Sequence, residues 1–177
     1  MTCRNHTVIV IIDVQGKLAK IVHNSEDLIR NLKILIKGAH LLGISILWTE
    51  QTPDKLGSTV PDISALYEGK PIVKNMFSCA RDKVFMKTLE ALKPHHILLA
   101  GIETHVCVLQ TAKDLLENYD VAVVADAVSS RTEFNKQIGL DGILLAGGSQ
   151  TSVESILFEL QEIAEGETFR QLIKLVK

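Results

Sequence analysis

The sequence predicts an α/β protein, a Rossmann-like three-layer sandwich whose six-stranded, mostly parallel sheet has the strand order 3-2-1-4-5-6. Short apolar runs alternate along the chain with longer segments whose apolar residues recur at helical spacing. Runs that are apolar throughout are typical of parallel strands covered by helices on both faces. No linker, internal repeat or low-complexity tract divides the chain, so residues 1–177 are expected to form one domain.

Six short runs are the predicted strands. They cover residues 7–12, 44–48, 71–73, 97–100, 121–125 and 149–152. The first run, TVIVII, is almost entirely β-branched, which indicates a strand buried on both faces. ILLA and VAVVA, the fourth and fifth runs, are fully apolar as well.

Six longer segments are the predicted helices. They cover residues 25–42, 82–92, 104–117, 133–145, 153–163 and 167–176. The first has a cap at Asn24 or Ser25 and Gly43 just past its end. Residues 51–69 contain two prolines and two glycines and are expected to be a loop with room for one helical turn. Such a long connection in a compact domain often builds a functional site.

Composition indicates an ordinary globular protein. Hydrophobic residues make up 46% of the chain and charged residues 23%, and the formal net charge is −2. This charge predicts neither nucleic-acid binding nor attraction to an anionic membrane. No run approaches the roughly 18 apolar residues that a spanning helix needs, and the polar residues 1–7 do not look like a leader.

The cysteines indicate a reducing compartment. Cys3, Cys79 and Cys107 form no CxxC pair and have no histidine at zinc-finger spacing. A cytoplasmic location is therefore expected. Cys3 is expected in a mobile tail, and Cys79 in a loop without a chemical role.

Three polar or reactive residues follow predicted strands, at the edge where doubly wound sheets carry their sites. Asp13 follows the first strand and Lys74 the third, while Cys107 opens the helix after the fourth. Each has a simpler interpretation as a turn cap, a solvated end residue or a small core residue. Their convergence on one crevice favours chemistry. In the first turn of a helix, the dipole and free N–H groups would favour the Cys107 thiolate and could receive an oxyanion.

The motifs around these residues resemble the isochorismatase-like cysteine hydrolase superfamily, which includes nicotinamidases and N-carbamoylsarcosine amidohydrolase. The similarity consists of D-x-Q at residues 13–15, the lysine after the third strand and G-I-x-T-x-x-C-V at residues 101–108. It extends in order over residues 8–158. TEQTPDKLGSTVP, KNMFSC and VVADAVSSR look closest to a branch of uncharacterised isochorismatase-domain proteins.

This resemblance implies a cysteine-dependent hydrolase that cleaves a C–N or similar bond, such as an amide, in a small molecule. Asp13 would be the general base, Lys74 would stabilise the thiolate, and Cys107 would form a thioester-type covalent intermediate. A cis peptide bond between Ile102 and Glu103 is also implied. It would turn the Glu103 N–H beside the Cys107 N–H to form an oxyanion hole.

Further residues are expected to contact the substrate. They are Gln15, Glu50, Gln51, Phe77, Thr104 and His105. For Glu50 the alternative is polar anchoring of a loop. His105 is not expected to form a dyad with Cys107, because helical residues i and i+2 point about 200° apart. Arg131 is expected to form a structural ion pair.

No metal or other cofactor is expected. Nicotinamidases bind a metal through an aspartate and histidines soon after the second strand, and the corresponding WTEQTPDKLG contains no histidine. The expected partner is a small-molecule substrate, with neither nucleic acid nor membrane, and homo-oligomers are expected. Two alternatives stay open: a non-catalytic α/β small-molecule-binding module and, with less support, a nuclease. The chain has neither the dinucleotide-binding G-x-G-x-x-G after the first strand nor a P-loop.

Overall fold

The computed structural model describes residues 4–67 and 69–177. Its six strands form one sheet in the order β3-β2-β1-β4-β5-β6, and every neighbouring pair is parallel. The predicted fold class is confirmed, and the sheet is parallel throughout. The strands are β1 (Thr7–Ile12), β2 (Ser45–Gln51), β3 (Ile72–Lys74), β4 (His96–Ile102), β5 (Asp120–Ser129) and β6 (Ser149–Thr151).

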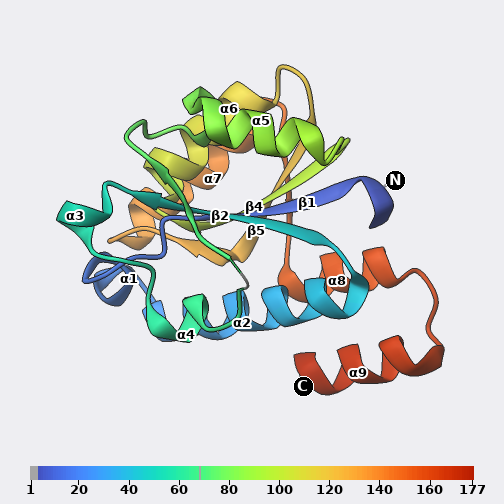
Figure 1. The fold of residues 1–177 in the computed structure, drawn as a ribbon. Coiled ribbons are helices and arrows are strands. Elements are labelled where there is room, and N and C mark those ends of the chain that lie inside the picture. Colours follow the sequence, from blue (N-terminus) through green and yellow to red (C-terminus); the bar gives the residue numbers. More distant parts are fainter. Residues whose placement is uncertain (1–3, 68) are drawn as a thin grey trace.

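Helices cover both faces of the sheet and make the three layers visible in Figure 1. On one side lie α1 (Leu18–Ile21), α2 (Ser25–Leu42), α4 (Pro61–Ser64) and α8 (Val153–Gln161), with α9 (Gly166–Val176) packed outside α2 and α8. On the other side lie α5 (Lys83–Ala91), α6 (Leu109–Leu115) and α7 (Glu133–Leu145). The remaining short elements are η1 (Arg4–His6), α3 (Pro53–Leu56), η2 (Cys79–Arg81) and the π-helical turn η3 (Thr104–Val108).

The core lies in two layers, one on each side of the sheet, and β1 contributes to both. Ile9 and Ile11 pack beneath α2 and α8, whereas Val8, Val10 and Ile12 pack beneath α5 and α6. Burying one such side chain stabilises the fold by about 1.5–3 kcal/mol relative to leaving it exposed. All six residues of β1 are buried, so this central strand holds the two halves of the domain together.

Some predicted boundaries are wrong. Strands β2, β4 and β5 run beyond their apolar runs, because parallel backbone pairing continues where the side chains turn polar. The single helix predicted over residues 104–117 is instead the π-helical turn η3 followed by the shorter α6. The loop predicted over residues 51–69 holds two short helices, α3 and α4, rather than one turn. The other predicted ends differ from the observed ones by no more than two residues, within the usual uncertainty of such boundaries.

The strand register brings four strand ends to one edge of the sheet. Ile12 lies opposite Thr49 of β2 and Gly101 of β4, and Gln51 lies opposite Lys74 of β3. Gly101 has a φ of +108°, and a Cβ there would lie 2.1 Å from the carbonyl oxygen of Ile12. Only glycine therefore permits this close approach of the β1 and β4 backbones.

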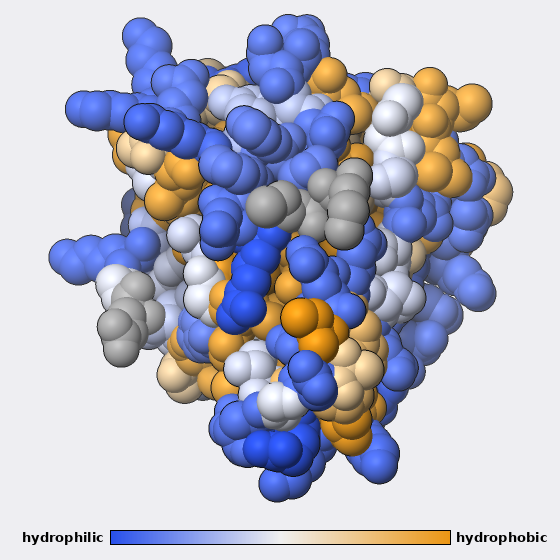
Figure 2. Space-filling model, turned by 90° about the vertical axis from the view of Figure 1, so that its right-hand side faces the viewer, coloured by the Kyte–Doolittle hydropathy of each residue, from blue (hydrophilic) through white to orange (hydrophobic). Residues whose placement is uncertain are grey.

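The opposite edge, at the amino ends of the strands, is the face shown in Figure 2. Hydrophilic side chains are spread over this face, and apolar side chains gather in smaller areas between them. Within the described ranges, no helix has both the length and the apolar character required to cross a membrane.

Candidate active site

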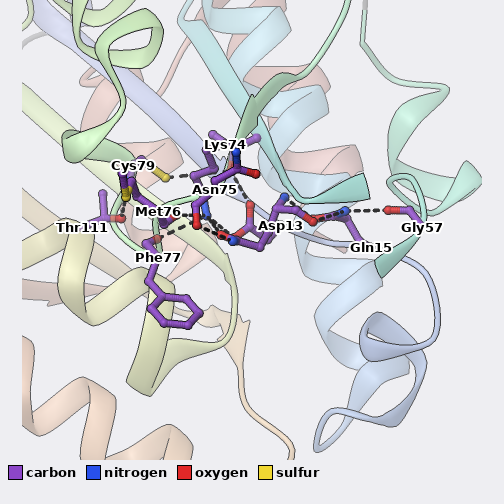
Figure 3. Close-up of polar contacts among 11 residues, drawn as sticks. Asp13, Gln15, Gly57, Lys74, Asn75, Met76, Phe77, Cys79 and Thr111 are labelled. Atoms are coloured by element: carbon purple, nitrogen blue, oxygen red, sulfur yellow. Dashed lines mark hydrogen bonds and ion pairs between the residues drawn. The ribbon is translucent and has the colours of Figure 1, made fainter. Parts of the chain in front are cut away.

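A buried ion pair lies at the carboxyl ends of β1 and β3. The Lys74 Nζ is 2.6 Å from the Asp13 Oδ2, and these residues are only 1% and 3% exposed. Removing two charges from water costs several kcal/mol per ion, so such a pair persists only where further hydrogen bonds satisfy both partners. Figure 3 shows Asp13 and Lys74 facing each other at the centre of a polar cluster.

Three further acceptors surround the Lys74 ammonium group. The Nζ donates to the Gln51 Oε1 at 2.7 Å and approaches the carbonyl oxygens of Met76 and Phe77, each at 3.2 Å. Burial lowers the pKa of Lys74, but the Asp13 carboxylate and the nearby thiols outweigh it and the pKa is raised overall. The lysine is therefore a fixed positive charge, and its partners are all at hydrogen-bond distance.

Asp13 is held on both oxygens. Its Oδ1 accepts a hydrogen bond from the Thr49 hydroxyl at 2.7 Å, while its Oδ2 faces Lys74. The backbone of Asp13 has a φ of +52°, a region that costs a non-glycine residue about 1–3 kcal/mol. Its carboxylate also lies close enough to Cys107 to raise the pKa of that thiol. The acid is thus fixed by Lys74 and Thr49, with the Cys107 thiol nearby.

Cys107 lies in η3, directly after the turn that leaves β4, and is 7% exposed. Burial raises the pKa of the Cys107 thiol, and the Asp13 carboxylate raises it further, against the opposing effect of Lys74. The expectation that this position favours a thiolate is therefore wrong for the resting state. The sequence pattern predicted an α-helical first turn, whereas the structure places the thiol in a π-helical turn beside a carboxylate.

Cys79 is a second thiol near the ion pair. It is 0% exposed, its Sγ lies 3.9 Å from the Thr49 hydroxyl, and its N–H donates to the Thr111 Oγ1 at 2.9 Å. Burial raises the pKa of Cys79 to about 11. The sequence had suggested only a loop residue here, and no local motif indicates this proximity. Figure 3 shows Cys79 beside Thr111, at the edge of the polar cluster.

The raised pKa of Cys79 predicts a loss of stability at alkaline pH. The unfolded thiol ionises from a pKa of about 9, whereas the folded thiol stays neutral to about 11. The free energy of unfolding should therefore fall as pH rises through this window, by about 3 kcal/mol in total. Urea unfolding of the wild type and of Cys79→Ser at intervals from pH 7.5 to 10.5 measures this. Serine does not titrate there, so identical slopes for the two proteins would contradict the prediction.

The segment before Cys107 is tied to its neighbours on both sides. The Ile102–Glu103 peptide bond is cis, and the Glu103 carbonyl accepts the N–H groups of Val106 and Val108 at 3.1 and 3.2 Å. The Glu103 carboxylate accepts hydrogen bonds from the N–H and the Nε of Arg131, both at 3.1 Å. This ion pair is the structural role expected for Arg131.

Helix α7 packs directly on η3. A Cβ at Gly139 would lie 2.6 Å from the backbone N of His105 and from the carbonyl carbon of Thr104. The His105 Nδ1 lies 2.9 Å from the Ser130 Oγ, which engages one nitrogen of this ring. Thr104 is fully buried, and its hydroxyl has no hydrogen-bond partner among the described residues.

Among the expected substrate contacts, two side chains, Gln15 and Glu50, hold the long connection against the sheet. The Gln15 Oε1 accepts the Gln51 N–H at 2.7 Å, and its amide donates to the Gly57 carbonyl at 2.6 Å. The Glu50 Oε1 accepts the N–H and hydroxyl of Thr59 at 2.7 and 2.8 Å. This geometry favours the loop-anchoring alternative for Glu50. Gln51 acts from the second strand as an acceptor for Lys74.

Phe77 differs from the other expected contacts. This residue is 55% exposed and its ring in Figure 3 extends away from the ion pair, although its carbonyl oxygen faces Lys74. In residues 4–67 and 69–177, no three His, Cys, Asp or Glu side chains are placed to hold a metal ion. Cys3 lies outside the described residues.

Thr49 is a residue that the sequence did not single out. Thr49→Val removes the donor to the Asp13 Oδ1 at nearly constant volume. The Asp13 carboxylate then loses a contact that fixes its orientation, worth about 1.5–3 kcal/mol for a hydrogen bond to a charged group, so alkylation of Cys107 by iodoacetamide should slow by roughly tenfold or more. Quenched time courses analysed by peptide mass spectrometry measure the rate. Thr88→Val is the control, because the Thr88 hydroxyl donates to the Val84 carbonyl on α5, away from the ion pair. If Thr49→Val does not change the alkylation rate, the role of Thr49 is purely structural.

The chain is an α/β protein with a parallel sheet, and the carboxyl ends of its strands carry a buried acid–lysine pair with two thiols nearby. The isochorismatase domain profile matches residues 7–155, and this chain belongs to the isochorismatase family. The secreted isochorismatase effector Isc1 of Phytophthora sojae is 37% identical, over 97% of this chain and 84% of its own length.

Two solved structures are similar over nearly the whole chain. The MAR1 ribonuclease of Caenorhabditis elegans is 34% identical, with a TM-score of 0.91 over 99% of this chain and 91% of its own. The YcaC gene product of Escherichia coli, an octameric hydrolase of unknown specificity, is 22% identical. Its TM-score is 0.90 over 97% of this chain and 88% of its own.

Proposed function

We propose that this protein hydrolyses a C–N bond in a small molecule, with an amide as the preferred substrate class. Cys107 is the nucleophile, Asp13 the general base and Lys74 the charge that holds the acid and the sulfur together. The observation that carries the proposal is the position of Asp13, which pairs with Lys74 through one oxygen and lies close enough to the Cys107 thiol to raise its pKa.

The proposed reaction has two halves. As the Cys107 sulfur attacks the carbonyl carbon, its proton passes to Asp13, and the C–N bond breaks as Asp13 returns that proton to the leaving amine. A thioester remains on Cys107. Water then attacks the thioester and loses its proton through Asp13 to the departing sulfur, which releases a carboxylic acid and restores the thiol.

The raised pKa of Cys107 supports a base that acts during the attack. A thiol that is neutral at rest is a weak nucleophile, so the proton must leave as the new bond forms. Lys74 balances the negative charge that the pair then shares. In the proposal, the N–H groups of Glu103 and Cys107 receive the developing oxyanion. The Glu103 carbonyl accepts hydrogen bonds from the N–H groups of Val106 and Val108 but not from that of Cys107 between them, which supports this role for the Cys107 N–H.

The proposal includes the setting in which the enzyme works. Residues 1–177 act as one domain, and copies assemble into a homo-oligomer, as the octameric relative from E. coli does. A cytoplasmic location remains the proposal, although the P. sojae relative is named as secreted. Gln15, Gln51, Phe77, Thr104 and His105 stay as proposed pocket residues.

A panel of small amides and esters tests the proposed function. Each is incubated with the protein at neutral pH, quenched in acid and examined by intact-mass and peptide mass spectrometry. We expect an acyl adduct on Cys107 and the release of amine or alcohol from at least one compound. A panel that yields neither adduct nor turnover, with all described thiols equally slow toward iodoacetamide, would instead favour the non-catalytic binding module.

A ribonuclease is the second candidate, because a relative that is 34% identical carries that name. The formal net charge of −2 gives no general attraction for a phosphate backbone. Incubation of a labelled single-stranded RNA with the wild type and with Cys107→Ala separates the two functions. Cleavage that requires Cys107 and falls steeply with salt would favour the nuclease over the amide hydrolase.

A further inference from the structure

A large hollow lies on the side of the sheet opposite the core layer that holds Cys107. It has a volume of about 910 Å³ and is formed by α1, α2, α4 and the end of α9. The helices that line it, α1, α2, α4 and α9, lie in Figure 1 on the side of the sheet opposite α5 and α6. Its volume falls within the roughly 300–1,000 Å³ that is usual for small-molecule sites.

One face of α2 supplies the groove with alternating apolar and charged side chains. Its lining residues are Glu26, Ile29, Arg30, Lys33, Ile34 and Lys37. This spacing of three and four places them on one side of the helix, distinct from the side that carries the buried Leu28 and Leu32. Ile29 and Ile34 pack against the core and are only partly buried, so they form the apolar floor of the groove.

The rim of the groove is basic, in contrast to the chain as a whole. Its charged side chains are Lys20, Arg30, Lys33, Lys37 and Lys177, against the acidic Glu26 and Asp62. The full sequence has 19 Lys and Arg and 21 Asp and Glu. Lys33 pairs with Asp62 at 3.1 Å and Arg30 with Asp27 at 2.8 Å. Lys20 and Lys37 form no ion pair within the described part of the chain, which leaves two unpaired cations beside an apolar floor.

The groove continues along α9. A second hollow of about 530 Å³ shares Lys37 and Leu175 with the first and is lined further by His40 and Lys174. No acidic side chain lines it. Neither hollow has an aromatic side chain other than His40 among its lining residues, so neither offers a platform on which nucleic-acid bases would stack.

We propose that this groove binds an elongated anionic amphiphile, specifically a long-chain carboxylate of the fatty-acid class. The hydrocarbon chain lies on Ile29, Ile34 and Val176, and the carboxylate pairs with Lys37 and Lys20. Binding there is independent of Cys107, because the groove and the thiol lie on opposite sides of the sheet.

Displacement of a fluorescent anion tests the proposal on the full chain. The groove is first loaded with 1-anilinonaphthalene-8-sulfonate, and dodecanoate is titrated below its micellar range. We expect saturable one-to-one displacement that weakens at high salt. Affinity should rise from octanoate to dodecanoate by up to about fourfold for each added methylene.

Charge reversal locates the site. The double variant Lys20→Glu/Lys37→Glu should lower the affinity for dodecanoate by tenfold or more. Lys87→Glu, on α5 across the sheet, should change this affinity by less than twofold. Circular dichroism melting checks that each variant is folded, and iodoacetamide labelling of Cys107 should be the same in all three. The proposal is overturned if affinity does not depend on chain length, or if the double variant binds dodecanoate like the wild type. It is equally overturned if single-stranded RNA displaces the dye and dodecanoate does not. A double variant that alters only the oligomeric state would also overturn it, because the groove would then bind a second copy of the chain.

Discussion

Cys107→Ala is expected to abolish both acyl-adduct formation and substrate turnover, with a loss of about 10³-fold or more. No neighbouring group replaces the sulfur, since Asp13 and Lys74 only prepare it. Cys79→Ala should keep turnover within about tenfold of the wild type, because this thiol is completely buried and its backbone is bound to Thr111. Intact-mass kinetics on the amide panel compare the three proteins directly.

The same pair of variants can also reverse the assignment. A protein that stays active as Cys107→Ala and becomes inactive as Cys79→Ala would make Cys79 the nucleophile. Melting temperatures separate this outcome from misfolding, because Cys79→Ala leaves a small cavity in a packed layer and should cost about 1–2 kcal/mol. Cys107→Ser serves as a second variant that nearly keeps the volume and still offers a hydroxyl proton near Asp13.

Lys74→Met should be the most destabilising single change in the site. Methionine fills most of the space but leaves the Asp13 carboxylate buried without its cation. Breaking a buried pair by removing one partner costs about 3–5 kcal/mol. For a domain of this size the melting temperature should fall by roughly 6–20 °C. Chemical denaturation and calorimetry measure the loss.

A double variant isolates the cause of that loss. Asp13→Asn/Lys74→Met removes the unpaired charge and should recover much of the stability, yet it should remain inactive because both the base and the cation are gone. Lys87→Met, an exposed change on α5, should shift the free energy of unfolding by less than about 0.5 kcal/mol. A Lys74→Met protein as stable as Lys87→Met would mean that the ion pair contributes nothing, and the fixed-charge role of Lys74 would be withdrawn.

The sequence by itself determined the sheet and the region of the site. Parallel strands that are covered on both faces must be apolar throughout, so TVIVII, ILLA and VAVVA could be recognised without any tertiary information. Asp13, Lys74 and Cys107 could be found because parallel strands end at one edge, where doubly wound folds carry their chemistry. Polar strand ends were less predictable, since their pairing depends on the neighbouring backbone and not on their own side chains.

Only the tertiary structure decided how these groups interact. Thr49 looks like an ordinary β-branched strand residue until the register places its hydroxyl against Asp13. Cys79 looks like a loop residue until η2 folds over the ion pair. The protonation of Cys107 likewise depends on burial and on a carboxylate that is distant in the chain. Electrostatic energies are set by distances and exposure in the folded molecule, which residue spacing along the chain does not contain.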